Sequence, residues 1–422
     1  MANKSPFPEM ASRREELSQC VNCGLCQSVC PTYRTDGYEG LTARGKIVLM
    51  KGLLDGSLKP SEAIADLFDD CLSCYACQTV CPAGVRTERL WTAARQDLAR
   101  WSSAAGKKRR ALRWTIGRPR LLNLTTRLTS AIFGFNPRRR DRVDVFSRRI
   151  PIFRGAPLQR KISGEYRPEG GRSTGTVGLL IGCSSNFITP DIAEATVQVL
   201  TAAGIRVVVP TDQVCCGAPA INNGDWNLAR RLAVRNLEVF ADLAADYVTS
   251  PDATCAQALK RDYLELFPEN HKRHTAARDL ARMTMDLGHL LARLAGEGRL
   301  KFNRIERKVT LHDSCHATHI GGGSRWREVL KLIPGLELVE MQDPAICCGF
   351  GGSYALFHEK SSNLIAARKI EHILETGVSQ VLTTSPGCAL KLQSAAIRGV
   401  HRELRFKHAV EVVGEASKKV SK

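Results

Sequence analysis

The sixteen cysteines of this 422-residue chain fall into four groups of four. The first two groups share the spacing C-x2-C-x2-C-x3-C, and a proline follows each of them. Bacterial ferredoxins hold a [4Fe–4S] cluster with this run, because thiolate is a soft ligand and short loops bring three sulfurs to one cube. Two such runs predict two clusters and a role in electron transfer. The runs comprise Cys20, Cys23, Cys26 and Cys30, then Cys71, Cys74, Cys77 and Cys81.

The fourth cysteine of each run is expected to cross to the other cluster, as it does in two-cluster ferredoxins. A pair of zinc knuckles is the alternative, but it would use two cysteines per knuckle and leave four without a role. The crossing predicts Cys20, Cys23, Cys26 and Cys81 for cluster 1, and Cys71, Cys74, Cys77 and Cys30 for cluster 2.

The other eight cysteines form a pattern that recurs after 132 or 133 residues, which indicates a duplication. Four thiolates suffice for one [4Fe–4S] cube or one tetrahedral zinc ion, so we predict a metal site in each repeat. Gly217 and Gly349 follow the paired cysteines and permit a backbone that turns both sulfurs inward. Buried structural thiols are the plainer interpretation. The two sets are Cys183, Cys215, Cys216 and Cys255, then Cys315, Cys347, Cys348 and Cys388.

The elements that position these cysteines can also be predicted. Apolar spacing and a closing glycine indicate a helix over residues 42–56, and Pro60-Ser61 begins a second helix. In each repeat, strands that end near the cysteines alternate with helices, which is typical of a largely parallel sheet. We expect an α+β multidomain protein, in which a helical two-cluster ferredoxin-like module precedes a duplicated α/β domain. The expected boundaries are 1–99, 100–170, 171–300 and 301–422.

The net charge of +19 is concentrated in one segment. Residues 100–161 hold 18 Lys/Arg and two Asp, with interleaved apolar residues between Leu121 and Phe133. Such a basic, partly amphipathic connector is typical of an element that docks on an anionic membrane surface or on a partner, and a solvated linker is the alternative. The segment has no nucleic-acid-binding motif, so we expect no nucleic-acid partner.

The compartment follows from the apolar pattern. The sequence has no run of eighteen apolar residues and no signal-peptide core at its start. We therefore expect a cytoplasmic protein, with the option of peripheral attachment to the inner face of the cell membrane. In a reducing compartment, cysteines at these spacings indicate metal ligands in preference to disulfides.

Four polar residues surround Cys315, namely His312, Asp313, His316 and His319. A histidine titrates near neutrality and could act as an acid or base. The first repeat lacks histidines at the corresponding places, with Ser184 and Phe187 in place of the last two. We therefore expect these groups to hydrogen-bond a cluster or to face a partner subunit, and we predict no catalytic residue in this chain.

The order C-x31-C-C-G followed by a further cysteine resembles the cysteine-rich "CCG" domain. Two ferredoxin runs before two such domains are similar to the glycolate oxidase iron–sulfur subunit family, as is the segment from Cys30 to Gly56, although Lys46 stands where arginine is usual. The heterodisulfide reductase form has a fifth cysteine per domain for an unusual non-cubane cluster. Asp252 and Ser385 occupy those positions here, so the resemblance does not extend to disulfide reduction.

The resemblance implies an electron-transfer subunit of a glycolate- or D-lactate-oxidising complex that works with a non-NAD acceptor. No G-x-G-x-x-G motif follows a strand, so we expect the flavin to lie on a separate FAD-containing hydroxy-acid dehydrogenase subunit, with a quinone as the acceptor. Three alternatives remain open. They are a heterodisulfide-reductase-like catalytic subunit, an anaerobic glycerol-3-phosphate dehydrogenase iron–sulfur subunit, and a zinc-stabilised docking platform with only the N-terminal clusters redox-active.

Overall fold

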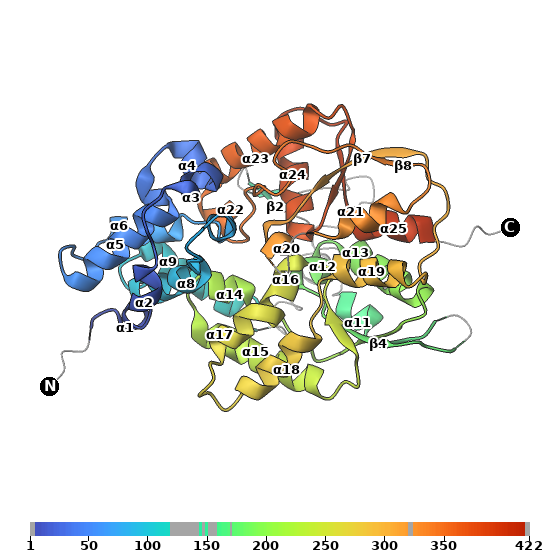
Figure 1. Ribbon diagram of the computed structural model, residues 1–422, viewed down its shortest axis with the longest axis horizontal. Helices are drawn as coiled ribbons and strands as arrows, with labels where there is room; N and C mark the ends of the chain where they lie inside the picture. Colours follow the sequence, from blue (N-terminus) through green and yellow to red (C-terminus); the bar gives the residue numbers. More distant parts are fainter. Residues whose placement is uncertain are drawn as a thin grey trace.

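The structure is a computed structural model that describes residues 5–118, 143–145, 148–150, 158–168, 171–319 and 324–417. It has the mixed helix and sheet architecture that the sequence predicts (Figure 1). The central part of the basic connector, residues 119–142, lies outside the described residues. None of the helices within the described ranges is long and apolar enough to cross a membrane.

The N-terminal module is built from short helices around its cysteines (Figure 1). The predicted helix over 42–56 is α5, which Thr42 caps and Gly56 ends, and the second predicted helix is α6, capped by Ser61. Both caps accept a backbone N–H that the first turn leaves unpaired. The helices are α1 (Pro8–Ala11), α2 (Arg14–Ser18), α3 (Leu25–Val29), α4 (Pro31–Asp36), η1 (Glu39–Leu41), α5 (Ala43–Asp55), α6 (Glu62–Asp69), α7 (Ala76–Thr79), α8 (Thr87–Leu98) and α9 (Ser103–Trp114).

The described start of the basic connector is helix α9, which packs against α6 of the module and against α14 in the first repeat. This part of the connector is therefore an ordered bridge between units. Three short elements follow before the first repeat: β1 (Val143–Val145), β2 (Arg148–Ile150) and α11 (Leu158–Ile162).

The first repeat, which we call unit A (residues 164–296), holds a four-stranded sheet in the order β3-β5-β4-β6. Its strands β4, β5 and β6 are parallel, as predicted, and β3 is an additional antiparallel edge strand. The elements are β3 (Gly164–Tyr166), β4 (Thr176–Leu179), α12 (Cys183–Phe187), α13 (Pro190–Ala202), β5 (Arg206–Val209), α14 (Ala218–Asn222), α15 (Trp226–Ala241), β6 (Tyr247–Thr249), α16 (Ala253–Gln257), the π-helix η2 (Ala258–Asp262), α17 (Tyr263–Leu266), α18 (His274–Met283) and α19 (Leu287–Gly296).

The second repeat, unit B (residues 307–417), repeats this plan with the order β10-β9-β7-β8, and all three pairings are parallel. Here the additional strand is β10, which joins the opposite edge. The elements are β7 (Arg307–His312), α20 (Cys315–His319), α21 (Trp326–Lys331), β8 (Leu336–Leu338), α22 (Tyr354–Phe357), α23 (Glu359–Leu374), β9 (Gln380–Thr383), α24 (Pro386–Arg398), β10 (Arg405–His408) and α25 (Ala409–Ser417).

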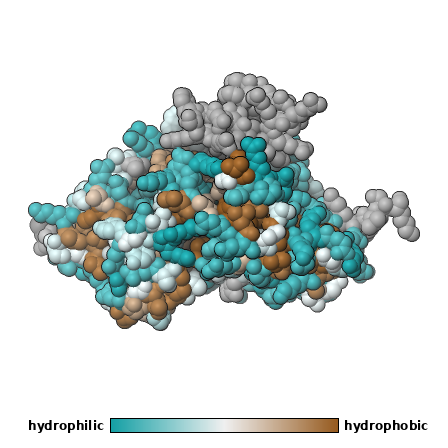
Figure 2. Space-filling view, turned by 90° about the horizontal axis from the view of Figure 1, so that it is seen from above, coloured by the Kyte–Doolittle hydropathy of each residue, from teal (hydrophilic) through white to brown (hydrophobic). Residues whose placement is uncertain are grey.

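Units A and B are not independent bodies, because one hydrophobic core runs through both. Buried Leu179 and Val207 of unit A belong to the same cluster as Leu311 and Val412 of unit B. Helix α25 packs on α13, and α21 packs on α19. The face shown in Figure 2 is mostly hydrophilic, with hydrophobic residues gathered in separate patches. The shared core fixes the relative position of the two cysteine sites.

Candidate metal and electron-transfer sites

The four cysteines assigned to cluster 1 line one cavity. Cys20, Cys23 and Cys26 come from the first run, and Cys81 reaches the cavity from the second run. Asn22 and Gly24 take positive φ angles of 56° and 82°, which curl the loop around the cavity. Cys23 is exposed. The cavity therefore reaches the surface, and Cys77 of the second run lines it as well, so five cysteines that include the crossed set meet there.

The four cysteines assigned to cluster 2 line a second cavity, which lies deeper in the molecule. Cys30 joins the three cysteines of the second run there, together with the buried side chain of Lys46. Burial raises the pKa of the Cys30 and Cys77 thiols, because the charged thiolate loses its hydration. A bound metal reverses this effect, since a coordinating thiol is deprotonated outright. The four thiols and the cavity fit a cluster.

The four cysteines of unit A form a row of contacting thiols at the carboxyl ends of the sheet strands. Cys183 contacts Cys215, Cys215 contacts Cys216, and Cys216 contacts Cys255. Gly217 has a φ of 90°, so the backbone after the pair takes the conformation that the sequence predicts. The contact with Cys215, together with burial, raises the pKa of Cys183 well above its usual range. This thiol set suits a metal ion or cluster that would stabilise the thiolates.

Asp252 occupies the position of the fifth cysteine in the heterodisulfide reductase form. Its hydrogen bonds do not indicate that it is a metal ligand. Its carboxylate accepts a hydrogen bond from the backbone N–H of Thr254 and so caps α16. It also accepts one from the hydroxyl of Ser385, the equivalent residue of unit B, at 3.1 Å. Burial raises the pKa of Asp252. The carboxylate is thus used by the fold.

The four cysteines of unit B form a similar row. Cys347 contacts both Cys315 and Cys348, and the sulfurs of Cys348 and Cys388 are 3.2 Å apart. Contacts with Cys347 and Cys388, and with His312, hold the pKa of Cys348 well below its usual range. Gly349 has a φ of 81°. Unit B therefore repeats the four-thiol arrangement of unit A but adds a histidine to it.

A cysteine of unit B contacts a cysteine that the sequence predicts for cluster 2. The thiol of Cys74 contacts the thiol of Cys347, and the two side chains share a small buried cluster with Leu72, Tyr354 and Ile365. No spacing in the sequence could predict this contact, because it joins residues 273 positions apart in different units. The contact places a predicted ferredoxin ligand directly beside a predicted ligand of the cysteine-rich domain.

His316 joins all three units at this point. Its Nε2 atom lies 3.0 Å from the carbonyl oxygen of Ser73, and its Nδ1 atom lies 2.9 Å from the hydroxyl of Thr254. A carbonyl oxygen can only accept, so Nε2 carries the proton and Nδ1 accepts from the hydroxyl. Burial lowers the pKa of His316 and favours this neutral form. Both ring nitrogens of His316 are therefore bonded to the module and to unit A, which leaves neither of them for the expected hydrogen bond to a cluster.

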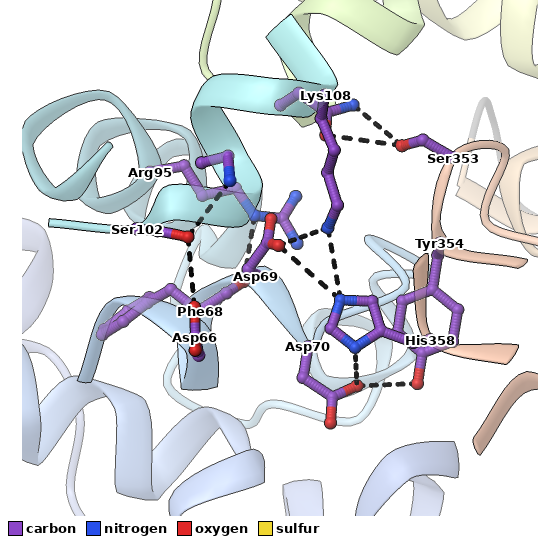
Figure 3. A network of polar contacts seen from close by, with 12 residues as sticks. Asp66, Phe68, Asp69, Asp70, Arg95, Ser102, Lys108, Ser353, Tyr354 and His358 are labelled. Carbon is purple, nitrogen blue, oxygen red and sulfur yellow. Dashed lines mark hydrogen bonds and ion pairs between the residues drawn. The ribbon is translucent and has the colours of Figure 1, made fainter. Parts of the chain in front are cut away.

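A second polar network closes the junction between the module and unit B (Figure 3). Lys108 of α9 pairs with Asp69, and its Nζ atom lies 3.3 Å from Nε2 of His358. Tyr354 donates a hydrogen bond of 2.7 Å to Asp70 and stacks on the ring of His358. These residues come from α6, α9 and the α22–α23 region, and they hold the segment that carries Cys71 against unit B.

Arg95 of α8 was missed by the sequence reasoning, because nothing in the spacing of a lone arginine marks it. It is 7% exposed, and its guanidinium donates to oxygens on both sides of the module–unit A boundary. The acceptors are the carbonyls of Phe68 (3.0 Å), Cys71 (2.6 Å) and Asn222 (2.5 Å) and the hydroxyl of Ser73 (2.7 Å).

Comparison with known families finds two domain types along the chain. A 4Fe-4S dicluster domain matches residues 16–85, and a cysteine-rich domain matches residues 177–260 and again residues 309–393. These matches cover the four cysteine groups, and the two domain types support iron–sulfur clusters as the cofactors.

Three relatives show the extent of the likeness. The chain is 28% identical to the "Probable glycolate oxidase iron-sulfur subunit" of Bacillus subtilis, over 95% of this chain and 94% of that protein. It is 28% identical to the glycolate oxidase iron-sulfur subunit of Escherichia coli, over 96% and 95%. It is 31% identical to lactate utilization protein A of Shouchella clausii, over 56% of this chain and 98% of that protein. The chain belongs to the family of iron–sulfur proteins that includes the glycolate oxidase iron–sulfur subunits and lactate utilization protein A.

Proposed function

We propose that this chain is the electron-transfer subunit of a flavoenzyme complex that oxidises glycolate or D-lactate. The relatives are named as subunits of glycolate oxidase and as a lactate utilization protein, which supports an iron–sulfur role in hydroxy-acid oxidation. Oxidation of a hydroxy acid removes two electrons, and clusters accept one electron at a time. A flavin on a partner subunit would therefore perform the hydride chemistry and release single electrons to this chain.

In this proposal the two N-terminal clusters have the crossed ligand sets, and the cysteines of units A and B hold two further metal centres. The domains run over 1–99, 100–170, 171–300 and 301–422. A metal centre supplies reversible one-electron transfer when bound, whereas this chain's residues hold it, exclude water and set its charge. The cytoplasmic location, the quinone acceptor and membrane docking of the connector belong to the same proposal.

The contact between Cys74 and Cys347 is the observation that carries the proposal. The cysteines proposed for cluster 1 include exposed Cys23, those proposed for cluster 2 include buried Cys74, and Cys74 contacts Cys347 of unit B. His316 and the Asp252–Ser385 pair then join units B and A. The proposed sites are thus linked by contacts from the surface at Cys23 to unit B, and from unit B to unit A, which supports a relay of single electrons.

The test is reduction of the chain by its proposed donor. The full chain would be co-purified anaerobically with its flavoprotein, mixed with glycolate, D-lactate or other 2-hydroxy acids, and frozen for electron paramagnetic resonance. We expect cluster signals that depend on substrate and on the flavoprotein. Clusters that stay oxidised with every 2-hydroxy acid would refute the proposal. Iron content separates the zinc-platform alternative, because two cubes alone account for about eight iron atoms per chain.

A further inference from the structure

The sites of units A and B differ in one residue that can bind a metal. His312 ends strand β7, and the register Leu311↔Leu382 in unit B matches Leu179↔Thr249 in unit A. Leu180 is therefore the unit A counterpart of His312. Both side chains are completely buried, so the difference is an imidazole against an alkyl group at the same place beside the paired cysteines.

Among the described residues, the His312 ring contacts the thiol of Cys348, itself a predicted metal ligand, and bonds to no nitrogen or oxygen of the fold. Both ring nitrogens are buried and have no hydrogen-bonding nitrogen or oxygen partner there. A buried imidazole with no nitrogen or oxygen partner loses the hydrogen bonds that water would give it, which costs about 1–3 kcal/mol. Its counterpart Leu180 avoids this cost and packs in the hydrophobic cluster that contains Cys216 and Cys255. The ring of His312 faces a thiol and no other polar group, which points to a ligand that the fold alone does not supply.

The position of the ring fits a shared metal. One ligand atom from each of His312, Cys348 and Cys388 lies within 4.8 Å of the other two. Two sulfurs bound to one zinc ion at 2.3 Å lie at most about 4.6 Å apart, so this triplet is close to coordination distance. Imidazole nitrogen binds zinc and iron, and it replaces thiolate on one iron of Rieske clusters.

The two sites also differ in the positive charge of the residues around them. The amino groups of Lys369 and Lys391 interact with the thiol of Cys348. With the offset of 133 residues that relates α23 and α24 to unit A, their counterparts are Asn236 and Ala258. Two cations next to the unit B site would offset the negative charge of several thiolates, whereas unit A has none at those places.

We propose that His312 is a ligand of the metal centre in unit B, so that this centre is bound by thiolates and an imidazole, and the centre in unit A by thiolates alone. The inference rests on the proposed metal-binding role of the cysteines in both units. With Cys315, Cys347, Cys348 and Cys388, His312 gives unit B five donors, one more than a single tetrahedral zinc ion uses. A [4Fe–4S] cube also uses four ligands, so the donor count alone does not choose between zinc and iron, and metal analysis identifies the metal.

The experiment compares the full chain with His312→Leu, which installs the unit A residue. His408→Gln is the matched control, because His408 is also completely buried but contacts Trp326 and the Val410 N–H instead of cysteines. Proteins would be purified anaerobically for iron and zinc analysis. Electron spin echo spectra would then be recorded with natural and 15N-labelled histidine.

We expect a strong histidine-nitrogen coupling in the wild type and in His408→Gln, and its loss in His312→Leu. We also expect unit B to bind its metal at least about 100-fold more weakly in His312→Leu, since even outer partners of ligands change affinity 10–100-fold. Iron retained at the N-terminal clusters and unit A would show that the variant is folded.

The possible outcomes are separable. If zinc falls by about one per chain in His312→Leu while iron is unchanged, the ligand role stands and the metal is zinc. If the metal content and the nitrogen coupling of His312→Leu equal those of the wild type, the inference is wrong, while the proposed electron-transfer function stands. If the wild type contains only the iron of two cubes and no zinc, both the metal role of units A and B and this inference fail.

Discussion

Replacing Arg95 by methionine is expected to loosen the N-terminal module from unit A. Methionine fills a similar volume but donates no hydrogen bond. The hydroxyl of Ser73 can rotate toward another partner, whereas the carbonyls of Phe68, Cys71 and Asn222 lose their donor. An unsatisfied buried group costs about 1–3 kcal/mol, so three carbonyls at the lower end give about 3 kcal/mol.

Urea unfolding under anaerobic conditions, followed by cluster absorbance and tryptophan fluorescence, measures this loss. With a denaturant slope of about 3 kcal/mol per M, the midpoint is expected to fall by about 1 M. Arg100→Met is the control. Its guanidinium donates to the Pro6 carbonyl at the surface and lies over the Trp101 ring, so removing it should cost less than about 1 kcal/mol. If Arg95→Met and Arg100→Met shift the midpoint equally, the reasoning from buried acceptors is refuted.

Three further predictions concern other sites. In Gly182→Ala, the new Cβ would lie 2.8 Å from the sulfur of Cys255. Metal analysis should therefore show that unit A loses its metal and that unit B retains its own. Unchanged metal content would contradict the close packing. Burial, with repulsion from Glu88, raises the pKa of Asp262 to about 7. A raised pKa means that the folded state favours the protonated carboxyl. Its contribution to the free energy of unfolding is complete below the unfolded pKa near 4 and is lost as pH rises through about 7. Since Asp262 is only partly buried, we expect a loss of about 2 kcal/mol. Asp262→Asn should flatten the urea midpoint between pH 4 and pH 7, and an unaltered slope would exclude Asp262 as its source. Lys46→Met removes a buried cation that lines the proposed site of cluster 2. A nearby unit charge contributes on the order of 2 kcal/mol, so redox titration should show a potential about 90 mV more negative. An equal potential would mean that Lys46 is uncharged.

Local signals in the sequence predicted the elements that carry the cysteines. The end of the first helix at Gly56, the start of the second at Pro60-Ser61 and the alternation of strands and helices are properties of neighbouring residues, and the structure confirms them. The additional strands β3 and β10 were not predicted. They are three and four residues long, and three of the four residues of β10 are polar, so neither has the apolar run of a central strand.

Contacts between units could not be predicted in the same way. The pairing of Cys74 with Cys347 and the bridging role of His316 depend on how separately folded surfaces meet, and no residue spacing encodes that. His312 was named as a neighbour of Cys315, but its special position became clear only when strand register identified Leu180 as its counterpart. Because unit A has no histidine at the corresponding position, the sequence alone gave no reason to assign His312 a role at the metal site.

The hydrogen bond between Asp252 and Ser385 joins equivalent positions of the two repeats. Such a contact is characteristic of a symmetric dimer, in which a residue near the axis meets its own copy. In a true homodimer, one substitution changes both subunits at once. The two sites stay identical, and an electron has the same energy at either of them. Covalent fusion removes that constraint. Each repeat can then be substituted alone, so the two sites can come to differ and electron transfer between them can acquire a direction.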